Sequence, residues 1–464
     1  MEMAWRWAQG LPMYNAPSIN HVAAPYFPLY FILLGFIYKF TGPVYWAGRL
    51  FSTLCAVATG IVVYRIVKRE AKNHLLGLLC SGIWFAGFSQ TGFFYDLIRV
   101  DSLAIVLLIA GYAVGFSKDG WVTGVLAGLF LAMSVIAKQN HLAFIAPVLF
   151  AMIIRKNYQG AIACAGIFAA VVPTFIYFYD QANDGWFIRF TMKYIRFRVM
   201  EEHITEYPMW FYSRYMIPTA IAFVFAFRKI RERKWADFFG NPWLGYLAAS
   251  FALSYVFRLP GGGYVNAKIP VALAAALVTG TLLPEAIGPA WIGNEKFANS
   301  FRSWVLVVMA WVTILALYRP LNNQIPDKRQ WIAAQNLHSF VQSQKGLVVV
   351  PYHLMPEPNV LKFHEMSYRD LSNGIWSDQY LGQIRKDLND LKPEAVLADK
   401  DFSTEKPAYM GMIKGMVKQH LDRSMRVKMT TGTRCEIKYL FYRSSHMPDM
   451  QEVAAPSHET EEEP

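Results

Sequence analysis

The sequence contains few charged residues: they make up 17% of its 464 residues, whereas soluble domains contain about 25%. Apolar residues make up 54% of the chain and aromatic residues 16%. This composition argues against a soluble enzyme and against a disordered chain. It is typical of a protein with several membrane spans. The mean hydropathy of only +0.23 indicates that part of the chain lies outside the membrane.

Cysteine is also scarce, with four residues that lie far apart in the sequence. Cys55, Cys80 and Cys164 fall in apolar segments, and Cys435 stands alone near the end. This spacing predicts neither a disulfide framework nor a metal-binding knuckle. The first 25 residues lack the basic start and apolar core of a secretory signal peptide.

Apolar runs of about the length that a membrane-spanning helix needs recur before residue 319, and a polar mixture follows. We predict ten spans: 46–66, 74–91, 101–117, 120–137, 140–155, 160–180, 209–227, 242–257, 266–284 and 302–318. The run 25–40 is shorter and carries two prolines at its start. It is therefore predicted to be an interfacial or re-entrant helix.

Lys and Arg are concentrated in the loops 65–72, 155–156 and 228–234, which predicts that these loops are cytoplasmic. The other loops are then extracytoplasmic, namely 1–45, 92–100, 181–208, 258–265 and everything after 318. The net charge of +12 is accordingly interpreted as a signal of topology and of contact with lipid phosphates. It is not interpreted as nucleic-acid binding.

Four regions are predicted: an outer-loop segment (1–45), a transmembrane domain of about ten helices (46–318), an extracytoplasmic α/β domain (319–443) and a disordered acidic tail (444–464). The α/β domain is expected to contain helices at 327–344, 378–391 and near 407–421. Its strands are expected at 346–350, 394–399, 425–429 and 435–442.

Acidic residues are rare in the first 180 positions, and two of the six fall in the loop FFYDLIRVDSLA (93–104) with Arg99 between them. Ionisable groups at a membrane boundary are costly unless they are solvated or functional. Asp101 precedes an apolar run and could simply cap the next helix. Asp96 has no such explanation. Both are therefore possible functional carboxylates.

Three further outer segments carry polar groups suited to an anion. Lys138, in the turn AKQNHLAF (137–144), is either a phosphate ligand or a lysine that extends to the interface. Three glycines (261–263) are followed by Asn266 and Lys268. The glycines either let the backbone approach a ligand closely or form a flexible loop. In the stretch 186–203, basic residues recur at helical spacing among aromatic residues. They are predicted either to bind lipid phosphate or simply to anchor the segment to the membrane surface.

The order of these features resembles the GT-C glycosyltransferases, which use polyprenyl-phosphate sugars and include protein O-mannosyltransferases and lipid A aminoarabinose transferases. AWRWAQGLPMY (4–14), YFPLYFILLGFIYKFTG (26–42) and AGRLFSTLCAVATGIVVYRIVKRE (47–70) match the family's first outer elements in order. Arg99–Val100–Asp101 and Lys138–Gln139 match its Arg-x-Asp and Lys-Gln elements. The resemblance covers roughly residues 1–318.

The resemblance implies an inverting transfer from a lipid-linked sugar to a hydroxyl of a lipid, glycan or protein, catalysed by a carboxylate base. No metal or other cofactor is required. The residues assigned to catalysis are Asp101, Asp96 and Glu2. Those assigned to the donor phosphate are Lys138, Lys268, Arg196, Arg198 and Arg99. Those assigned to the sugar cavity are His21, Tyr26, Tyr30, Asn140, Asn266 and Gly262.

In this family the catalytic carboxylate lies in the first outer loop, after a first transmembrane helix, and the present sequence begins after both. We therefore expect that the true base lies upstream of Met1. The expected location is the plasma membrane, which in bacteria is the inner membrane. The alternatives are a transporter or flippase of a lipid-linked sugar, and a non-catalytic scaffold. Charges gathered at one outer face rather than at the midplane favour the enzyme.

Overall fold

The computed structural model describes residues 1–193, 201–260, 264–286, 295–318, 327–349, 360–361, 377–399, 413–429 and 435–443. The chain divides into two compact units. The first contains residues 1–13 and 25–191 and continues from 197 to 319. The second contains 14–24, 192–196 and the residues from 320 onward. Each unit is described by itself.

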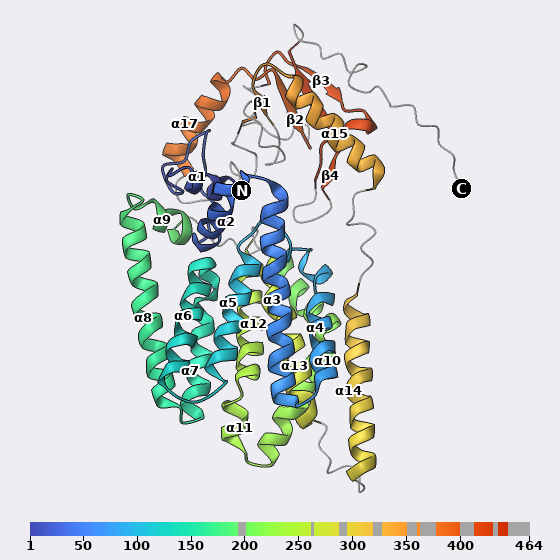
Figure 1. Cartoon of the computed structure of the whole chain (residues 1–464). Coiled ribbons are helices and arrows are strands. Elements are labelled where there is room, and N and C mark those ends of the chain that lie inside the picture. Colours follow the sequence, from blue (N-terminus) through green and yellow to red (C-terminus); the bar gives the residue numbers. More distant parts are fainter. Residues whose placement is uncertain are drawn as a thin grey trace, which may run out of the picture. The chain divides into compact units, whose positions relative to one another are not determined.

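The first unit is helical throughout (Figure 1). Its α-helices are α1 (Glu2–Ala8), α2 (Leu29–Thr41), α3 (Tyr45–Ala71), α4 (His74–Ala86), α5 (Asp101–Gly115), α6 (Trp121–Ala137), α7 (Ile145–Ile154), α8 (Tyr158–Gln181), α9 (Trp186–Ile188), α10 (Glu201–Arg231), α11 (Trp235–Phe239), α12 (Pro242–Arg258), α13 (Ile269–Ala286) and α14 (Glu295–Leu317). Short 3-10 helices occupy Ser89–Thr91, Gln139–Phe144 and Val265–Lys268. Arg189–Lys193 forms a π-helix, of which the last two residues are assigned to the second unit.

Each of the ten apolar segments predicted from the sequence contains a helix. Within the described residues, three helical stretches are long and apolar enough to cross a membrane by themselves, namely Tyr45–Ala71, Tyr158–Gln181 and Val265–Ala286. Several others are apolar but shorter. The apolar helices indicate an integral membrane protein.

The helix α10 differs most from its predicted span, since it begins at Glu201 and is kinked at Tyr215 (φ −119°, ψ 24°). Pro218 explains the kink, because it lacks an N–H and its ring clashes with the carbonyl four residues earlier. The predicted span 140–155 is also not one regular helix. It begins with the 3-10 helix Gln139–Phe144 and continues as α7.

The predicted interfacial segment 25–40 contains α2, which packs on α1. The absence of a side chain at Gly35 allows this contact, since a Cβ there would lie 2.6 Å from the Trp7 ring and 2.8 Å from the Ala4 carbonyl oxygen. The ammonium of Lys39 lies 4.8 Å from the centre of the Trp7 ring. Whether this pair is re-entrant in a membrane stays a prediction.

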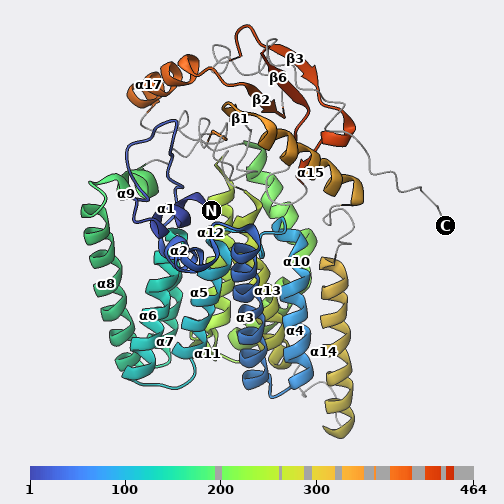
Figure 2. The ribbon, with the colours of Figure 1, turned by 45° about the horizontal axis from the view of Figure 1, so that its top comes forward.

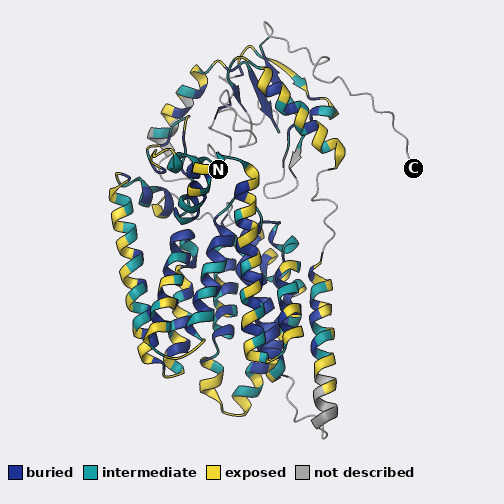
Figure 3. Ribbon diagram, viewed as in Figure 1, coloured by how far each residue is buried: buried dark blue, intermediate teal, exposed yellow. Residues whose placement is uncertain are grey.

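Helix α13 forms the centre of the bundle, where it contacts α3, α4, α10 and α12 (Figures 1 and 2). All of its residues except Pro284 and Glu285 are buried, and Figure 3 colours the ribbon by burial. Helices α6 and α8 pack so closely that a Cβ at Gly128 would lie 2.5 Å from the Cys164 carbonyl oxygen. Small residues allow such close contact between apolar helices.

The bundle has two ends that differ in what they carry. Helix α5 begins, and α6 and α12 end, at what we call the site end (Figure 1). The basic loops that follow α3, α7 and α10 lie at the opposite end, together with α11 (Figure 1). This separation agrees with the predicted parity of the spans. The assignment of the two ends to membrane sides stays a prediction.

The second unit contains a four-stranded sheet of order β1-β2-β6-β3 and a two-stranded sheet of β4 and β5. Its elements are α15 (Lys328–Ser343), β1 (Val348–Val349), α17 (Ser377–Asp390), β2 (Ala395–Ala398), β3 (Val417–His420), the 3-10 helix Arg423–Met425, β4 (Lys428–Met429), β5 (Cys435–Glu436) and β6 (Tyr439–Tyr442). Strands β1 and β2 are parallel, and the other pairs are antiparallel. Leu337 and Phe340 of α15 pack on the sheet residues Val348, Leu397 and Leu440 to form the core.

The helix predicted near 407–421 is wrong where the structure describes it, because Val417–His420 form β3. Gly415 adopts a left-handed conformation (φ 76°), which ends any preceding helix. Val417 then pairs with Tyr442 and His420 with Tyr439 in the antiparallel register. The predicted strand 435–442 also divides into β5 and β6, which belong to different sheets. Residues 407–412 lie outside the described residues.

Candidate functional site

Asp101 is the first residue of α5, and its side chain does not cap the helix. The capping interpretation is therefore wrong: Val100 holds the N-cap position, with no side-chain hydrogen bond to the helix. The reason is that both carboxylate oxygens of Asp101 accept from other side chains, Oδ1 from Lys138 and Asn266 and Oδ2 from Arg99. Hydrogen bonds from charged donors are stronger than those from neutral backbone N–H groups.

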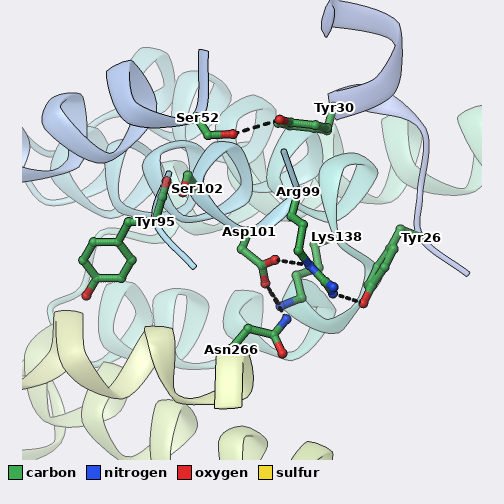
Figure 4. A network of polar contacts seen from close by, with 9 residues as sticks. All are labelled: Tyr26, Tyr30, Ser52, Tyr95, Arg99, Asp101, Ser102, Lys138 and Asn266. Carbon is green, nitrogen blue, oxygen red and sulfur yellow. Dashed lines mark hydrogen bonds and ion pairs between the residues drawn. The ribbon is translucent and has the colours of Figure 1, made fainter. Parts of the chain in front are cut away.

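Three segments converge on this carboxylate (Figure 4). The Lys138 ammonium lies 2.6 Å from Asp101 Oδ1, and the Asn266 side-chain amide donates to the same oxygen at 2.9 Å. Arg99 Nε donates to Oδ2 at 3.3 Å. Because Arg99 also donates to the Tyr26 hydroxyl, we call these five residues the polar network. It joins three of the segments that the sequence marked as polar to Tyr26, at the start of the apolar run 25–40.

The local backbone explains how Lys138 reaches α5. Helix α6 ends at Ala137, and Lys138 is extended (φ −150°, ψ 108°), which turns its side chain out of the helical path. Its N–H still donates to the Ser134 carbonyl oxygen at 2.9 Å. On the other side, Asn266 lies in the 3-10 helix that precedes α13.

The network is buried at Asp101, Lys138 and Asn266 and carries a net positive charge. The side chains of Asp101 and Lys138 are only 1% and 7% exposed, whereas that of Arg99 is 33% exposed. Two cations and one carboxylate leave a charge of +1. A buried uncompensated charge is costly, so the network is suited to an anion that approaches from the side of Arg99.

Arg99 is also held by aromatic rings. Its guanidinium carbon lies 5.2 Å from the centre of the Tyr26 ring and 5.0 Å from that of Phe94. Burial of the guanidinium opposes its charge, but Tyr26 and Asp101 outweigh this effect and raise the pKa of Arg99. The Gln139 side chain donates to the Pro25 carbonyl oxygen at 2.8 Å. This bond ties the segment that carries Tyr26 to the turn that carries Lys138.

A second group of polar residues lies on α10, α12 and the start of α13. Lys268 is buried, and its ammonium lies 3.8 Å from the centre of the Trp210 ring. Arg258 pairs with Glu206 at 2.9 Å and lies 3.3 Å from His203 Nδ1. Lys268 follows Asn266 by two residues, so this aromatic-supported cation belongs to the same end of the bundle as the network.

Asp96 is separate from the network, although it lies only five residues before Asp101. One of its oxygens pairs with Arg49 of α3, which is half-exposed. The other oxygen, Oδ1, is buried and has no hydrogen-bond partner among the described residues. The two carboxylates of this loop therefore differ, since Asp101 is fully paired and Asp96 keeps an acceptor oxygen.

The remaining predicted residues are dispersed. The Tyr30 hydroxyl is bonded to Ser52 of α3 at 2.8 Å and does not join the network (Figure 4). Glu2 lies in the first turn of α1, and Asn140 is partly exposed in the 3-10 helix after Lys138. His21 belongs to the second unit, where it forms a two-residue bridge with Ser18.

Arg196, Arg198 and Gly262 lie outside the described residues. Of the predicted basic helix, the structure describes Arg189 and Lys193, which lie in the π-helix rather than in an α-helix. The guanidinium of Arg189 lies 4.8 Å from the centre of the Trp186 ring. The proposed common basic face is therefore not tested beyond residue 193.

Sequence reasoning missed Ser134, His141 and Trp210, which support the two predicted lysines. His141 is only three residues from Lys138, and a histidine in an otherwise apolar stretch was an available signal. Ser134 and Trp210 carried no such signal, because serine and tryptophan are common in apolar helices.

No protein-family model matches the sequence, and no curated protein matches it either. Two crystal structures of ArnT from Cupriavidus metallidurans are similar to this chain. The structure bound to undecaprenyl phosphate has a TM-score of 0.57 at 12% sequence identity, covering 94% of this chain and 92% of that one. The apo structure has a TM-score of 0.60 at 11% identity, covering 98% and 93%.

This likeness extends over nearly the whole of both chains and shows that the chain has the fold of ArnT, a GT-C fold. The predicted fold class is thereby confirmed, including a small C-terminal sheet. At this low identity the likeness establishes the fold, and the chemistry must be argued from the residues.

Proposed function

We propose that this protein is an integral-membrane glycosyltransferase that moves a sugar from a polyprenyl-phosphate donor to an acceptor hydroxyl. The observation that carries the proposal is the buried polar network with a net charge of +1, in a chain with the fold of ArnT. One ArnT structure is bound to undecaprenyl phosphate. A phosphate anion would neutralise the network charge.

In the proposed reaction, the acceptor oxygen forms a bond with the anomeric carbon, and the bond from that carbon to the phosphate oxygen breaks. The electron pair leaves with the polyprenyl phosphate, which is a stable anion and needs no general acid. A carboxylate takes the proton of the acceptor hydroxyl. Attack from the opposite face inverts the anomeric configuration.

The charges suggest a division of roles among these residues. Arg99 and Lys138 stabilise the charge that develops on the leaving phosphate, and Lys268 is a further phosphate ligand. Asp101 is paired with two cations. It is therefore better placed to position those cations than to remove a proton. Asp96, with its unpartnered oxygen, is the better base among the described carboxylates.

The remaining assignments are parts of the same proposal. Tyr26, Asn140 and Asn266 contact the sugar or its phosphate, and no metal is required. Tyr30 and His21 stay predictions as sugar contacts, as do Arg196 and Arg198 as phosphate ligands, Gly262 as a close-approach residue and Glu2 as an alternative base. The site end and the second unit are proposed to be extracytoplasmic.

The experiment is sugar transfer in proteoliposomes. The purified protein is supplied with undecaprenyl-phosphate donors that carry different labelled sugars, and with envelope lipids and glycans as acceptors. We expect labelled acceptor together with an equal amount of free undecaprenyl phosphate. Asp96→Asn should reduce both products at least about 100-fold, whereas Asp119→Asn, in the exposed loop between α5 and α6, should not.

The rival functions give different results in the same vesicles. A transporter or flippase would move the labelled donor across the bilayer with the sugar–phosphate bond intact. A scaffold would neither cleave nor move it. Either outcome, with every donor tested, would contradict the transferase.

A further inference from the structure

A second buried connection between α5 and α6 lies beside the ion pair of Asp101 and Lys138. The hydroxyl of Ser134, on α6, lies 2.8 Å from the carbonyl oxygen of Ala104, on α5. The same hydroxyl lies 2.7 Å from Nδ1 of His141. Ser134 and His141 are both buried. Ala104 follows Asp101 by three residues, about one turn of the helix.

The protons in this chain of bonds can be assigned. The Ala104 carbonyl has no proton, so Ser134 donates its only proton there. The serine oxygen must then accept, and Nδ1 of His141 must carry the hydrogen. A second proton on the ring would add charge to a buried region that already carries +1, which is unfavourable. His141 is therefore neutral, protonated at Nδ1 and unprotonated at Nε2.

These bonds close a small ring around Lys138. The Lys138 N–H donates to the Ser134 carbonyl oxygen at 2.9 Å, and the His141 N–H donates to the Lys138 carbonyl oxygen at 3.0 Å. The hydrogen bond between His141 Nδ1 and the Ser134 hydroxyl closes the ring. Because Lys138 is extended and lies beyond the end of α6, this ring restricts where its side chain can point.

We propose that Ser134 and His141 are positioning residues for Lys138. They fix the turn 138–141 against α5, so that one N–H of the ammonium stays on Asp101 and the others are presented to an anionic ligand. The identity of that ligand as a polyprenyl phosphate rests on the proposed function. The positioning of Lys138 does not.

The first test is a double-mutant cycle that needs no ligand. The thermal midpoints are measured for the whole protein in detergent with Lys138→Met, His141→Ala and the double variant. If His141 acts through Lys138, the double variant should lose no more than the larger single loss. Thr281→Ala, which removes a buried hydroxyl bond near the other end of α13, should add fully to Lys138→Met. Full additivity for His141→Ala would overturn the proposal.

The second test measures binding of undecaprenyl phosphate to the protein in nanodiscs. Ser134→Ala and His141→Ala should weaken binding about tenfold, and the donor KM should rise while kcat is kept. His141→Asn should stay within about twofold of the wild type, because an asparagine amide can replace the Nδ1–H donor. A merely structural role would lower the amount of active protein without changing the donor KM.

The outcomes separate the two proposals. If His141→Asn binds as weakly as His141→Ala, donation from Nδ1 is not what matters and the positioning role fails. If His141→Asn binds normally but loses kcat, the imidazole is itself a base, which also overturns it. If the wild type does not bind undecaprenyl phosphate although the cycle shows coupling, the proposed function fails and the positioning role stands.

Discussion

Replacing Lys138 with Met tests how far the buried ion pair stabilises the bundle. The ammonium lies 2.6 Å from Asp101, whose side chain is 1% exposed. Removing one partner of a buried pair typically costs about 3–5 kcal/mol, because the other charge is left without compensation. Asp101 keeps Arg99 and Asn266, so we expect the lower end of this range, about 3 kcal/mol.

The double variant Asp101→Asn/Lys138→Met removes both charges while keeping similar side-chain volumes. We expect its free energy of unfolding to lie within about 1 kcal/mol of the wild type, since replacing a whole buried pair is often neutral and Arg99, which loses its carboxylate, is 33% exposed and can be solvated. The double variant should therefore be more stable than Lys138→Met alone. This reversal is specific to a buried carboxylate that has lost its buried cation in the single variant.

The assay is the free energy of unfolding in mixed micelles, followed by tryptophan fluorescence. Lys234→Met is the matched control, because Lys234 pairs with Glu232 in an exposed position and should cost at most about 1 kcal/mol. If Lys138→Met costs no more than Lys234→Met, the buried ion pair does not stabilise the bundle. The same conclusion follows if the double variant is less stable than Lys138→Met.

Three further predictions concern the donor, the base and the packing of the helices. Tyr26→Phe removes the hydroxyl that accepts a hydrogen bond from Arg99. Because Arg99 is partly solvated, the loss is modest, and in steady-state kinetics the donor KM should rise about fivefold with kcat unchanged. A fall in kcat without a rise in the donor KM would contradict this. Asp96→Asn should lower kcat at least about 100-fold. Its thermal midpoint should stay close to that of the control variant Asp119→Asn. An Asp96→Asn variant that keeps its activity would exclude Asp96 as the base. Gly128→Ala should lower the free energy of unfolding by about 1–3 kcal/mol, because the added Cβ would meet the Cys164 carbonyl oxygen. Gly166→Ala is the control and should cost nothing, because the added Cβ would enter open space. Equal losses in the two variants would show that the close packing of α6 on α8 is not the cause.

The positions of the helices could be predicted from the sequence because apolar length alone determines them. All ten predicted segments contain helices, and the fold class follows from their order. The kink at Tyr215 and the 3-10 start of the segment 139–154 were not predicted. Such breaks depend on how a helix packs on its neighbours, which hydropathy does not report.

The site could be predicted only in part. Asp101 was marked because ionisable groups at a membrane boundary are costly. Lys138 and Asn266 were marked as polar groups of outer segments, and Arg99 through the family resemblance. The structure brings these four together. Their pairing could not be predicted, since it depends on how α5, α6 and α13 align. The expected cap at Asp101 was wrong for the same reason: Lys138 and Asn266, which occupy one of its carboxylate oxygens, are distant in sequence.

In the second unit, the alternation of strands and helices was recognised, but β3 was mistaken for a helix. The sequence GMIKGMVKQH has no clear alternation of apolar and polar residues. Its pairing with β6 comes from backbone hydrogen bonds between segments about 20 residues apart. A pattern within one segment does not report such long-range pairing.

We propose that the site end of the bundle binds the phosphate of a polyprenyl lipid. The equilibrium binding of undecaprenyl phosphate and undecaprenol is compared for the wild type, Arg99→Gln and Arg69→Gln in nanodiscs. Arg69 is the control because it lies near the end of α3, at the opposite end of the bundle, and pairs with Glu70. We expect the wild type and Arg69→Gln to bind the phosphate at least about tenfold more tightly than the alcohol, and Arg99→Gln to lose most of this preference. Equal binding of the two lipids by the wild type, or a full preference in Arg99→Gln, would show that Arg99 and the site end do not bind the lipid phosphate.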